Sequence, residues 1–379
     1  MKILMICNTD LSSNESLGVV KKVKGQYSAF SNLGCDTYLA CLNNGNAVLN
    51  HAGTERIIVE RKNKLVFTVF TMFKKIPNIV KEEKIDVCFI RYPLADWAFI
   101  KMLKQLYRIS TVVIEMPTFP YDQQASNNKN IVSQFNFFQD KHYRKYLKRY
   151  VKCFVTYGDQ ETIYDVKCIK INNGIDVSSV KYLGDKLIYN KDINLIAVAR
   201  VQRDHGYDRI IEGMKVYYDN NVSPKVKINL HIVGSGEAES ELKKLVMKYS
   251  LSQYVYFHGV KTGNELEKLY LSSQIGVGFL GIFRSGLNAI SALKNKEYCA
   301  VGIPIFGSAI DNSIPVGADY YKMIQNDDSP VNMNDIIQFF DYIKKHPEMH
   351  SQLRNLAENE LSWEKQLQIV INELLVHRI

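Results

Sequence analysis

The sequence of 379 residues has no apolar run of about 18 residues, so we expect no transmembrane helix. Its opening apolar stretch, residues 2–7, gives way to Asn8, Thr9 and Asp10 and is too short for a signal-peptide core. Glycine and proline are not enriched, and no long low-complexity tract is present. These absences favour a folded protein that stays in the cytoplasm.

The seven cysteines form no Cys-x-x-Cys pair and no Cys/His cluster at metal-binding spacing. They are scattered through apolar stretches, which predicts reduced core residues. The hydrophobic fraction of 46% and the charged fraction of 23% are typical of a soluble globular protein. A formal charge of +9 makes an anionic partner plausible, but charge alone does not separate nucleic acid, phospholipid and phosphorylated metabolites.

Short β-rich runs alternate with amphipathic helical patterns, which predicts parallel sheets with helices on both faces. A polar stretch at 176–192 separates two such series, so we expect an N-terminal domain at 1–180 and a C-terminal domain at 181–361. The terminal helix, 362–379, has an apolar face that we expect to pack back on the first domain. The fold class is therefore α/β, with two tandem Rossmann-like doubly wound domains facing a cleft that binds ligand.

The most informative stretch is 291–304, which places Glu297 in a helical pattern that stops at Gly302-Ile-Pro304. Ala289, Ile290, Leu293 and Tyr298 are spaced to form one buried stripe of a helix over 289–300. Glu297 falls near that stripe. Its carboxylate must then meet a basic side chain or accept hydrogen bonds from ligand hydroxyls, and the pattern alone favours neither.

Three further loops follow predicted strands. The loop 8–18 ends at Gly18 before a helix, where free amides favour phosphate, but no Gly-x-Gly-x-x-Gly motif is present. The loop 200–209 carries Arg200, Arg203, His205 and Arg209. We expect Arg200 to grip a diphosphate and Arg209 to lie on a solvated helix face beside Asp208 or Glu212. The turn at Gly234-Ser-Gly236 lets backbone approach a ligand, although turn chemistry explains it equally well.

In order and spacing, these motifs resemble retaining glycosyltransferases of family 4, which have the glycosyltransferase-B fold. The resemblance covers nearly the whole chain. The segment Glu115–Tyr121 also resembles a branch found in bacterial surface-polysaccharide pathways. The resemblance to family 4 as a whole rests on the motifs Ile171–Asp176, Val198–Arg200, His205–Arg209, Ile232–Gly236, Phe257–Val260 and Glu297–Pro304.

The resemblance implies a transferase that moves a sugar from a nucleotide-diphosphate sugar to a glycan or lipid-linked acceptor. Glu297 would hold the ribose hydroxyls, and Arg200, with Arg203 and His205, would stabilise the leaving diphosphate. Backbone around Ser291, Ala292 and Leu293 would cradle the distal phosphate. The remaining donor contacts are expected at the Gly234 turn, at the Val260 backbone for the base, and at Gly18 from the other domain.

Three departures from the family pattern concern the sugar and the diphosphate. Ala289 stands where the first glutamate of the family's paired-glutamate motif is expected. His205 replaces a diphosphate-binding lysine, with Arg203 as possible compensation. The histidine that often touches the donor sugar has no equivalent near Pro117 or Thr118. The nucleotide contacts are therefore better supported than the sugar contacts.

The mechanism implied by the family lets the leaving phosphate accept the acceptor's proton, so we expect neither metal nor cofactor. We expect the acceptor to bind the first domain near Thr118, Lys21 and Lys22. Segment 141–152 carries six basic residues at helical spacing. It is either an ordinary solvated helix or a docking face for anionic phospholipid.

Two other functions keep the same architecture. A nucleotide-sugar epimerase lacks support, because no paired carboxylates and histidines typical of proton abstraction are present. A catalytically degenerate partner subunit is compatible with Ala289, although such a scaffold has little need for Arg200 or Glu297. Nucleic-acid binding is disfavoured because no aromatic platform or recognition-helix motif accompanies the basic residues.

Overall fold

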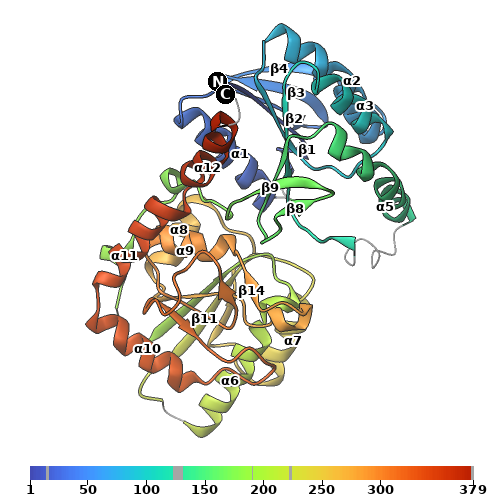
Figure 1. Cartoon of the computed structure of the whole chain (residues 1–379). Helices are drawn as coiled ribbons and strands as arrows, with labels where there is room; N and C mark the ends of the chain where they lie inside the picture. Colours follow the sequence, from blue (N-terminus) through green and yellow to red (C-terminus); the bar gives the residue numbers. More distant parts are fainter. Residues whose placement is uncertain (14–16, 123–130, 190, 222–223, 377–379) are drawn as a thin grey trace. The chain divides into compact units, whose positions relative to one another are not determined.

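The computed structural model describes residues 1–13, 17–122, 131–189, 191–221 and 224–376 (Figure 1). The chain divides into two compact units. Unit 1 is Met1–Gly174 with Trp363–Ile379, and unit 2 is Ile175–Ser362. The polar segment 176–192 thus belongs to unit 2, where Leu183 and Leu187 are buried in the core.

Unit 1 is built on a nine-stranded sheet of order β4-β3-β2-β1-β5-β6-β7-β9-β8. The strands from β2 to β9 in this order are parallel, and an antiparallel strand or hairpin extends each end. The strands are β1 (Lys2–Asp10), β2 (Asp36–Asn43), β3 (Asn46–His51), β4 (Thr54–Val59), β5 (Val87–Arg91), β6 (Thr111–Met116), β7 (Cys153–Thr156), β8 (Thr162–Ile163) and β9 (Val166–Lys170).

Strand β3 follows a two-residue turn in which Asn44 and Gly45 both have positive φ, at 50° and 77°. This is the turn that hairpins prefer, because its twist matches that of the two strands. The Asn-Gly pair was therefore a usable signal in the sequence.

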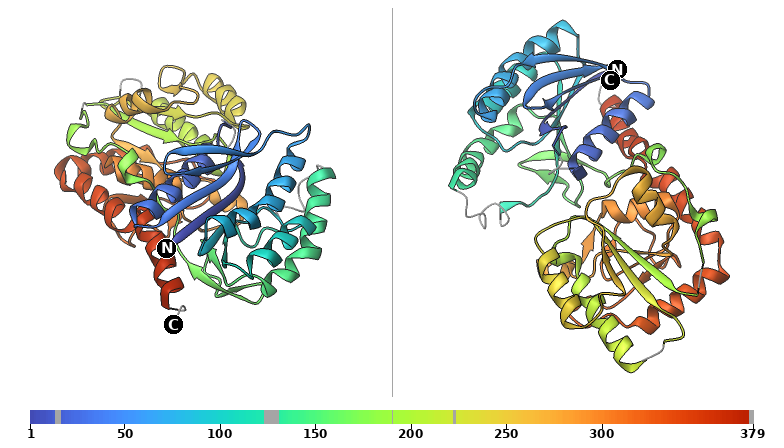
Figure 2. Two further views of the ribbon diagram at one scale, coloured as in Figure 1. Left: turned by 90° about the horizontal axis from the view of Figure 1, so that it is seen from above. Right: turned by 180° about the vertical axis from the view of Figure 1, so that it is seen from behind.

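Helices cover both faces of this sheet (Figure 2). The helices α2 (Leu65–Glu82) and α3 (Trp97–Leu106) bury apolar side chains against one face. On the other face, α1 (Leu17–Asn32) lies beside α12 (Trp363–Val376), whose Leu367 and Val370 are fully buried. The apolar stripe of the terminal helix thus forms part of the core of unit 1.

The predicted basic helix over 141–152 is wrong. Helix α5 (Ile131–Tyr143) ends inside it and a 3-10 helix, Arg144–Arg149, follows. Asp140 is fully buried, and Arg144 pairs with it at 3.5 Å and with Asp122 at 2.7 Å. A buried carboxylate needs a counter-charge, so Arg144 turns inward rather than toward solvent.

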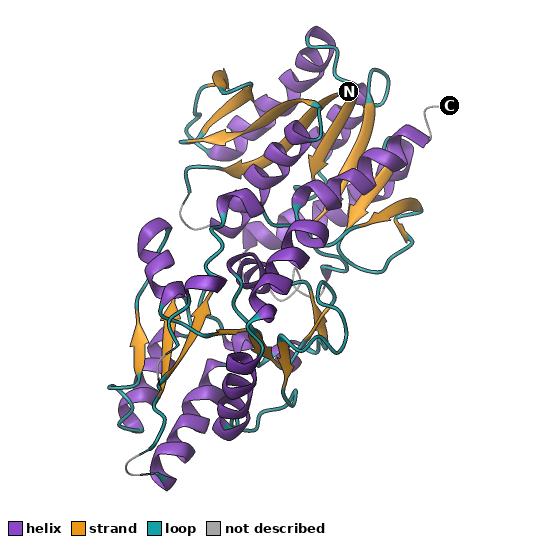
Figure 3. Ribbon diagram, turned by 90° about the vertical axis from the view of Figure 1, so that its left-hand side faces the viewer, coloured by secondary structure: helices purple, strands orange, loops and turns teal. Residues whose placement is uncertain are grey.

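Unit 2 has a six-stranded parallel sheet of order β12-β11-β10-β13-β15-β17, with helices on both sides (Figure 3). Its strands are β10 (Ile193–Val198), β11 (Ile228–Val233), β12 (Val255–Phe257), β13 (Ile275–Val277), β15 (Ile305–Gly307) and β17 (Tyr321–Met323). Its helices are α6 (Tyr207–Asn220), α7 (Glu239–Lys248), α8 (Gly263–Leu271), α9 (Leu293–Val301), α10 (Met333–Lys345) and α11 (Glu348–Leu356). Two short strands, β14 (Ala289–Ile290) and β16 (Ile310–Asp311), pair with each other outside this sheet.

Helices that could span a bilayer were sought among the described residues, and none is both long and apolar enough. The doubly wound α/β fold expected from the alternating pattern is confirmed in both units. In such sheets, ligands bind beyond the carboxyl ends of the strands. A ligand site is therefore expected at that edge of each sheet.

Candidate functional site

At the carboxyl edge of the unit 2 sheet, the loop after β10 holds the three cations predicted to meet a diphosphate. The Arg200 side chain is exposed, and no described residue pairs with it or accepts its hydrogen bonds. Arg203 is also exposed but pairs with Glu241 on α7 at 2.9 Å. His205 is 5% exposed, and burial, with a smaller effect from the charge of Lys294, lowers its pKa to about 2. His205 is therefore neutral, and its predicted cationic role is wrong.

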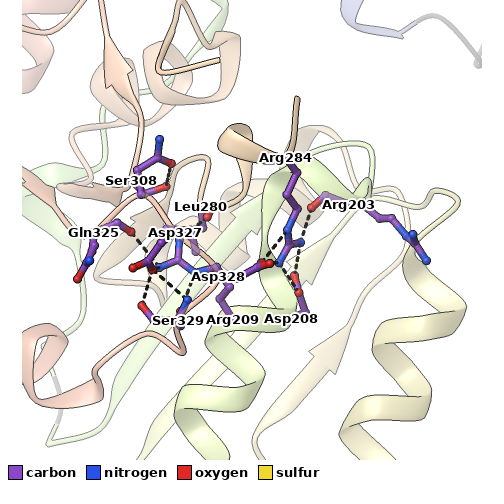
Figure 4. A network of polar contacts seen from close by, with 11 residues as sticks. Arg203, Asp208, Arg209, Leu280, Arg284, Ser308, Gln325, Asp327, Asp328 and Ser329 are labelled. Atoms are coloured by element: carbon purple, nitrogen blue, oxygen red, sulfur yellow. Dashed lines mark hydrogen bonds and ion pairs between the residues drawn. The ribbon is translucent and has the colours of Figure 1, made fainter. Parts of the chain in front are cut away.

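The prediction for Arg209 is also wrong, because this side chain is 1% exposed rather than solvated. Its guanidinium donates to the carbonyls of Ser329 at 2.8 Å, Gln325 at 2.9 Å and Leu280 (Figure 4). These carbonyls belong to two different loops, so Arg209 holds both loops against α6. Each acceptor lies more than 70 residues from Arg209 along the chain, so only the fold brings them within hydrogen-bond distance.

Beside this network, Arg284 makes a second set of contacts that fixes the same edge. Its guanidinium pairs with Asp208 at 2.7 Å and with Asp328 at 2.6 Å, and it donates to the carbonyl of Arg203 at 2.9 Å (Figure 4). Arg200 is therefore the exposed cation of this loop that has no partner among the described residues.

The turn after β11 requires glycine at position 234. Its φ is +131°, and a Cβ there would lie 1.9 Å from the carbonyl oxygen of Ala199. The Gly234 N–H donates to the Gly259 carbonyl at 2.8 Å, which joins this turn to the end of β12. Val260 follows directly and its side chain is exposed. The turn therefore serves close backbone packing at the edge, and Val260 stands at its surface.

Helix α9 begins at Leu293, four residues later than predicted. Ala289 and Ile290 instead pair with Ile310 and Asp311 as β14 and β16, so the predicted stripe through Ala289 is wrong. The carboxylate of Asp311, the last residue of β16, lies beside the start of this helix. It accepts hydrogen bonds from the Ala292 N–H at 3.2 Å and from the side-chain amide of Asn295 at 2.9 Å.

The contact with Asp311 affects the backbone that was predicted to bind the distal phosphate. The Ala292 N–H predicted to meet phosphate already has a buried carboxylate as acceptor. The Ser291 hydroxyl contacts the Ser313 hydroxyl at 3.1 Å, and Leu293 is exposed. Asp311 stands 19 residues beyond Ala292, and no spacing rule in the sequence pointed to it.

Glu297 lies in the middle of α9 and is half-buried. The hydroxyl of Tyr270, a buried residue of α8, donates to its Oε1 at 3.2 Å. This bond orients one oxygen of the carboxylate. Since the group is half-buried, a hydroxyl of a ligand is a suitable further partner.

The predicted residues of unit 1 are divided between surface and core. Gly18 lies in the first turn of α1, with nothing within 4 Å of the place where a Cβ would stand. Lys21 and Thr118 are exposed, on α1 and in the loop after β6. Lys22 is buried, so the expected basic face of α1 does not include it.

Lys22 instead belongs to a buried cluster around Glu115. Its Nζ lies 3.0 Å from Glu115 Oε1, and Arg91 lies 2.9 Å from Oε2. Gln26 and Tyr157 donate to the same carboxylate. Burial raises the pKa of Glu115, but the two cations and these hydrogen bonds outweigh it and lower the pKa to about 2. The sequence around Glu115 gave no signal of this role, because its partners Lys22 and Arg91 lie far from it along the chain.

Comparison with known proteins adds to this geometry. Residues 181–358 match the family model described as glycosyl transferases group 1. The matched region lies within unit 2. No curated protein matches the sequence.

Solved structures are similar to this protein over the whole chain. Sucrose-phosphate synthase from Thermosynechococcus elongatus aligns over 100% of this chain and 98% of its own, with a TM-score of 0.64 and 13% identity. Starch synthase IV from Arabidopsis thaliana, bound to ADP and acarbose, aligns over 100% and 99%, with a TM-score of 0.64 and 12% identity. The pneumococcal O-GlcNAc transferase GtfA, in complex with UDP and GlcNAc, aligns over 99% of both chains, with a TM-score of 0.61 and 12% identity. At this identity the likeness establishes the glycosyltransferase-B fold.

Proposed function

We propose that the protein is a retaining glycosyltransferase of family 4 that transfers a hexose-type sugar from a nucleotide-diphosphate sugar. The acceptor is a glycan or a lipid-linked saccharide of bacterial surface-polysaccharide synthesis, such as capsule or exopolysaccharide. The observation that carries the proposal is Arg200, an exposed guanidinium without a partner among the described residues, at the carboxyl edge where α9 with Glu297 begins. The nucleotides bound by the starch synthase and by the O-GlcNAc transferase support it by analogy of fold.

In this proposal the guanidinium of Arg200 stabilises the negative charge that develops on the leaving diphosphate. The leaving phosphate takes the proton of the acceptor hydroxyl, and Glu297 holds the ribose. Side-chain cations supply the positive charge, so the reaction needs no metal or other cofactor. Activity that survives a chelator supports this part, and activity restored only by a divalent cation contradicts it.

A donor screen tests the proposal. Release of nucleotide diphosphate is measured from UDP-, GDP-, ADP- and CDP-sugars, in the presence of membranes or lipid-linked oligosaccharide. The variants Arg200→Ala and Glu297→Ala should each lower kcat/KM by about 10- to 100-fold, since each removes a charge-assisted hydrogen bond of about 1.5–3 kcal/mol. Arg203→Ala, which removes an exposed cation from the same loop, is the matched control. Equal losses of kcat/KM in all three variants would contradict the specific roles of Arg200 and Glu297.

A second candidate is a catalytically degenerate partner subunit. It is favoured by Ala289 at the first glutamate position and by the Asp311 carboxylate at the Ala292 N–H. Thermal unfolding separates the two, because a ligand that binds the folded state raises the melting temperature. A shift with one nucleotide diphosphate that Glu297→Ala abolishes supports the enzyme, and no shift with any nucleotide supports the scaffold.

We further propose that the enzyme lies in the cytoplasm. There it would bind anionic phospholipid through α2, α3 and α5. These helices carry exposed aromatic side chains in a basic setting: Lys74 lies over Phe70, Lys101 over Trp97, and Phe70 stacks on Trp97. Helix α3 has no acidic residue, and the one acid of α5, Asp140, is buried. The exposed apolar residues of this surface include Phe67, Trp97, Ile131, Phe135 and Phe138.

Vesicle sedimentation tests this surface. The protein should pellet with vesicles that contain phosphatidylglycerol and not with phosphatidylcholine alone, because aromatic burial and charge attraction act together. Phe135→Asp with Phe138→Asp should release it. Val316→Asp, at a still more exposed apolar residue of unit 2, is the control. Binding that survives the double change, or that ignores lipid charge, contradicts the proposal.

A further inference from the structure

Buried polar atoms without a partner gather at one place on the carboxyl edge of unit 2. Four buried side-chain atoms in the part of the chain that the structure describes have no hydrogen-bond partner. Three of them, Asp204 Oδ1, His205 Nδ1 and Tyr207 OH, belong to the loop after β10 and the start of α6. Such atoms are costly unless a ligand or water satisfies them.

Lys294 enters the same place from the first turn of α9. It is 8% exposed, and its Nζ donates to the Gly278 carbonyl at 2.8 Å. An ammonium has three donors, and this is the one hydrogen bond that Nζ makes with a described residue. The rings of Phe279 and Tyr207 complete its surroundings, with centroids 4.4 and 5.4 Å from Nζ.

The charge of Lys294 acts directly on the loop after β10. It lowers the pKa of His205 further, after the larger effect of burial. Burial lowers the pKa of Lys294, the carboxylate of Asp204 raises it by a smaller amount, and the resulting pKa is about 7. The groups that face Lys294 are thus Asp204 and His205 from the loop and Tyr207 from α6, besides the Gly278 carbonyl.

Of the three positions expected to hold the diphosphate, only Arg200 presents a positive charge without a partner among the described residues. His205 is neutral, and Arg203 is exposed and paired with Glu241. We propose that Lys294 supplies the cation that contacts the donor diphosphate, in place of the residue at position 205. This inference rests on the proposed function, and it names a binding residue that the motif comparison did not contain.

Lys296, two residues further along α9, provides the contrast. It is 1% exposed, and its Nζ lies 3.0 Å from the Ser291 hydroxyl and 3.5 Å from the Ala292 carbonyl. Burial lowers the pKa of Lys296, and the charge of Asp311 opposes this effect. Lys296 is therefore satisfied by its own loop and serves as a control of the same residue type, helix and burial.

The decisive measurement is proton uptake when a nucleotide diphosphate binds. A phosphate beside Lys294 favours its charged form and raises its pKa, so a fraction of a proton, about one half at pH 7, is taken up. Isothermal titration with UDP, GDP, ADP and CDP, in buffers of different ionisation enthalpy, reports that number. The nucleotide's own ionisation is common to all variants and cancels in their comparison.

Lys294→Met should weaken binding by about 10- to 100-fold and remove this part of the proton uptake. Lys294→Arg should keep measurable binding but lose the proton uptake, because a guanidinium stays charged. Lys296→Met should keep the proton uptake. Circular dichroism confirms that each variant is folded.

The outcomes separate this inference from the proposed function. If the wild-type protein binds none of the four nucleotides, both are overturned. If it binds one of them, Glu297→Ala abolishes binding, and Lys294→Met binds within twofold with unchanged proton uptake, only the role of Lys294 is overturned.

Discussion

Replacing Glu115 by glutamine should destabilise unit 1 by about 3–5 kcal/mol at pH 7. The carboxylate is 1% exposed and lies within 3.0 Å of both Lys22 and Arg91. Glutamine keeps the volume but leaves two cations without their counter-charge, and breaking a buried pair in this way costs about 3–5 kcal/mol. The double change Lys22→Met with Glu115→Gln should be less costly than Glu115→Gln alone, because one of these cations is then gone.

The pKa of Glu115 gives a second route to the same magnitude. Its pKa is about 2 in the folded protein and 4.5 without the fold. A pKa lowered by folding stabilises the protein above the unfolded value, and that stability is lost as pH falls through the folded value. The difference is worth about 3 kcal/mol, of which about 2 kcal/mol is lost by pH 3. The gap between wild type and Glu115→Gln should therefore narrow between pH 7 and pH 3.

Tryptophan fluorescence during urea unfolding measures this effect in unit 1 alone. The chain has two tryptophans, Trp97 and Trp363, and both belong to unit 1. Glu161→Gln is the control, since Glu161 is exposed and pairs with an exposed Lys170, so its loss should cost less than about 1 kcal/mol. A cost below about 1 kcal/mol for Glu115→Gln, or a gap that does not change with pH, would refute this reasoning.

Three further changes test the packing of the two units. Gly234→Ala places a Cβ 1.9 Å from the Ala199 carbonyl oxygen. It should lower the free energy of unfolding of unit 2 by at least about 2 kcal/mol, as measured by circular dichroism during urea unfolding. An unchanged urea midpoint would contradict the need for glycine at this position. Arg209→Met leaves three carbonyls without their donor and should lower the free energy of unfolding by about 3 kcal/mol or more. Arg203→Met, at an exposed ion pair, should lower it by less than about 1 kcal/mol. Similar losses in the two variants would show that the buried contacts of Arg209 do not stabilise the unit. Leu367→Ala should cost about 2–5 kcal/mol by tryptophan fluorescence if α12 is part of the core of unit 1, and a negligible cost contradicts that packing.

The strands and helices could largely be predicted because their signals are local. The β-branched runs at 193–198 and 228–233 and the apolar stripe of α12 are each visible within one stretch of sequence. The start of α9 could not be predicted in this way. Propensity and spacing allowed a helix from Ala289, but Ala289 and Ile290 pair with β16, and Asp311 of that strand accepts a hydrogen bond from the Ala292 N–H.

The candidate site residues also divide into those that local sequence signals could predict and those that depend on distant contacts. The position of Arg200 after β10 followed from the strand pattern, and its exposure agrees with the interpretation made from it. The states of His205, Arg209 and Lys22 did not follow, because each depends on burial and on partners that are distant along the chain. Lys294 drew no attention in the sequence, where a lysine at a helix start is usually solvated.

The sequence by itself determined the fold class, the two sheets and the loops that lie at their carboxyl ends, because periodicity and turn residues act over a few positions. Only the tertiary structure decided which charged side chains are available to a ligand. Folding buries Lys22 against Glu115 and Arg209 against three carbonyls, leaves Arg200 exposed, and brings Lys294 beside a neutral His205. Desolvation and charge pairing depend on distances in space, and residues far apart in the sequence set them.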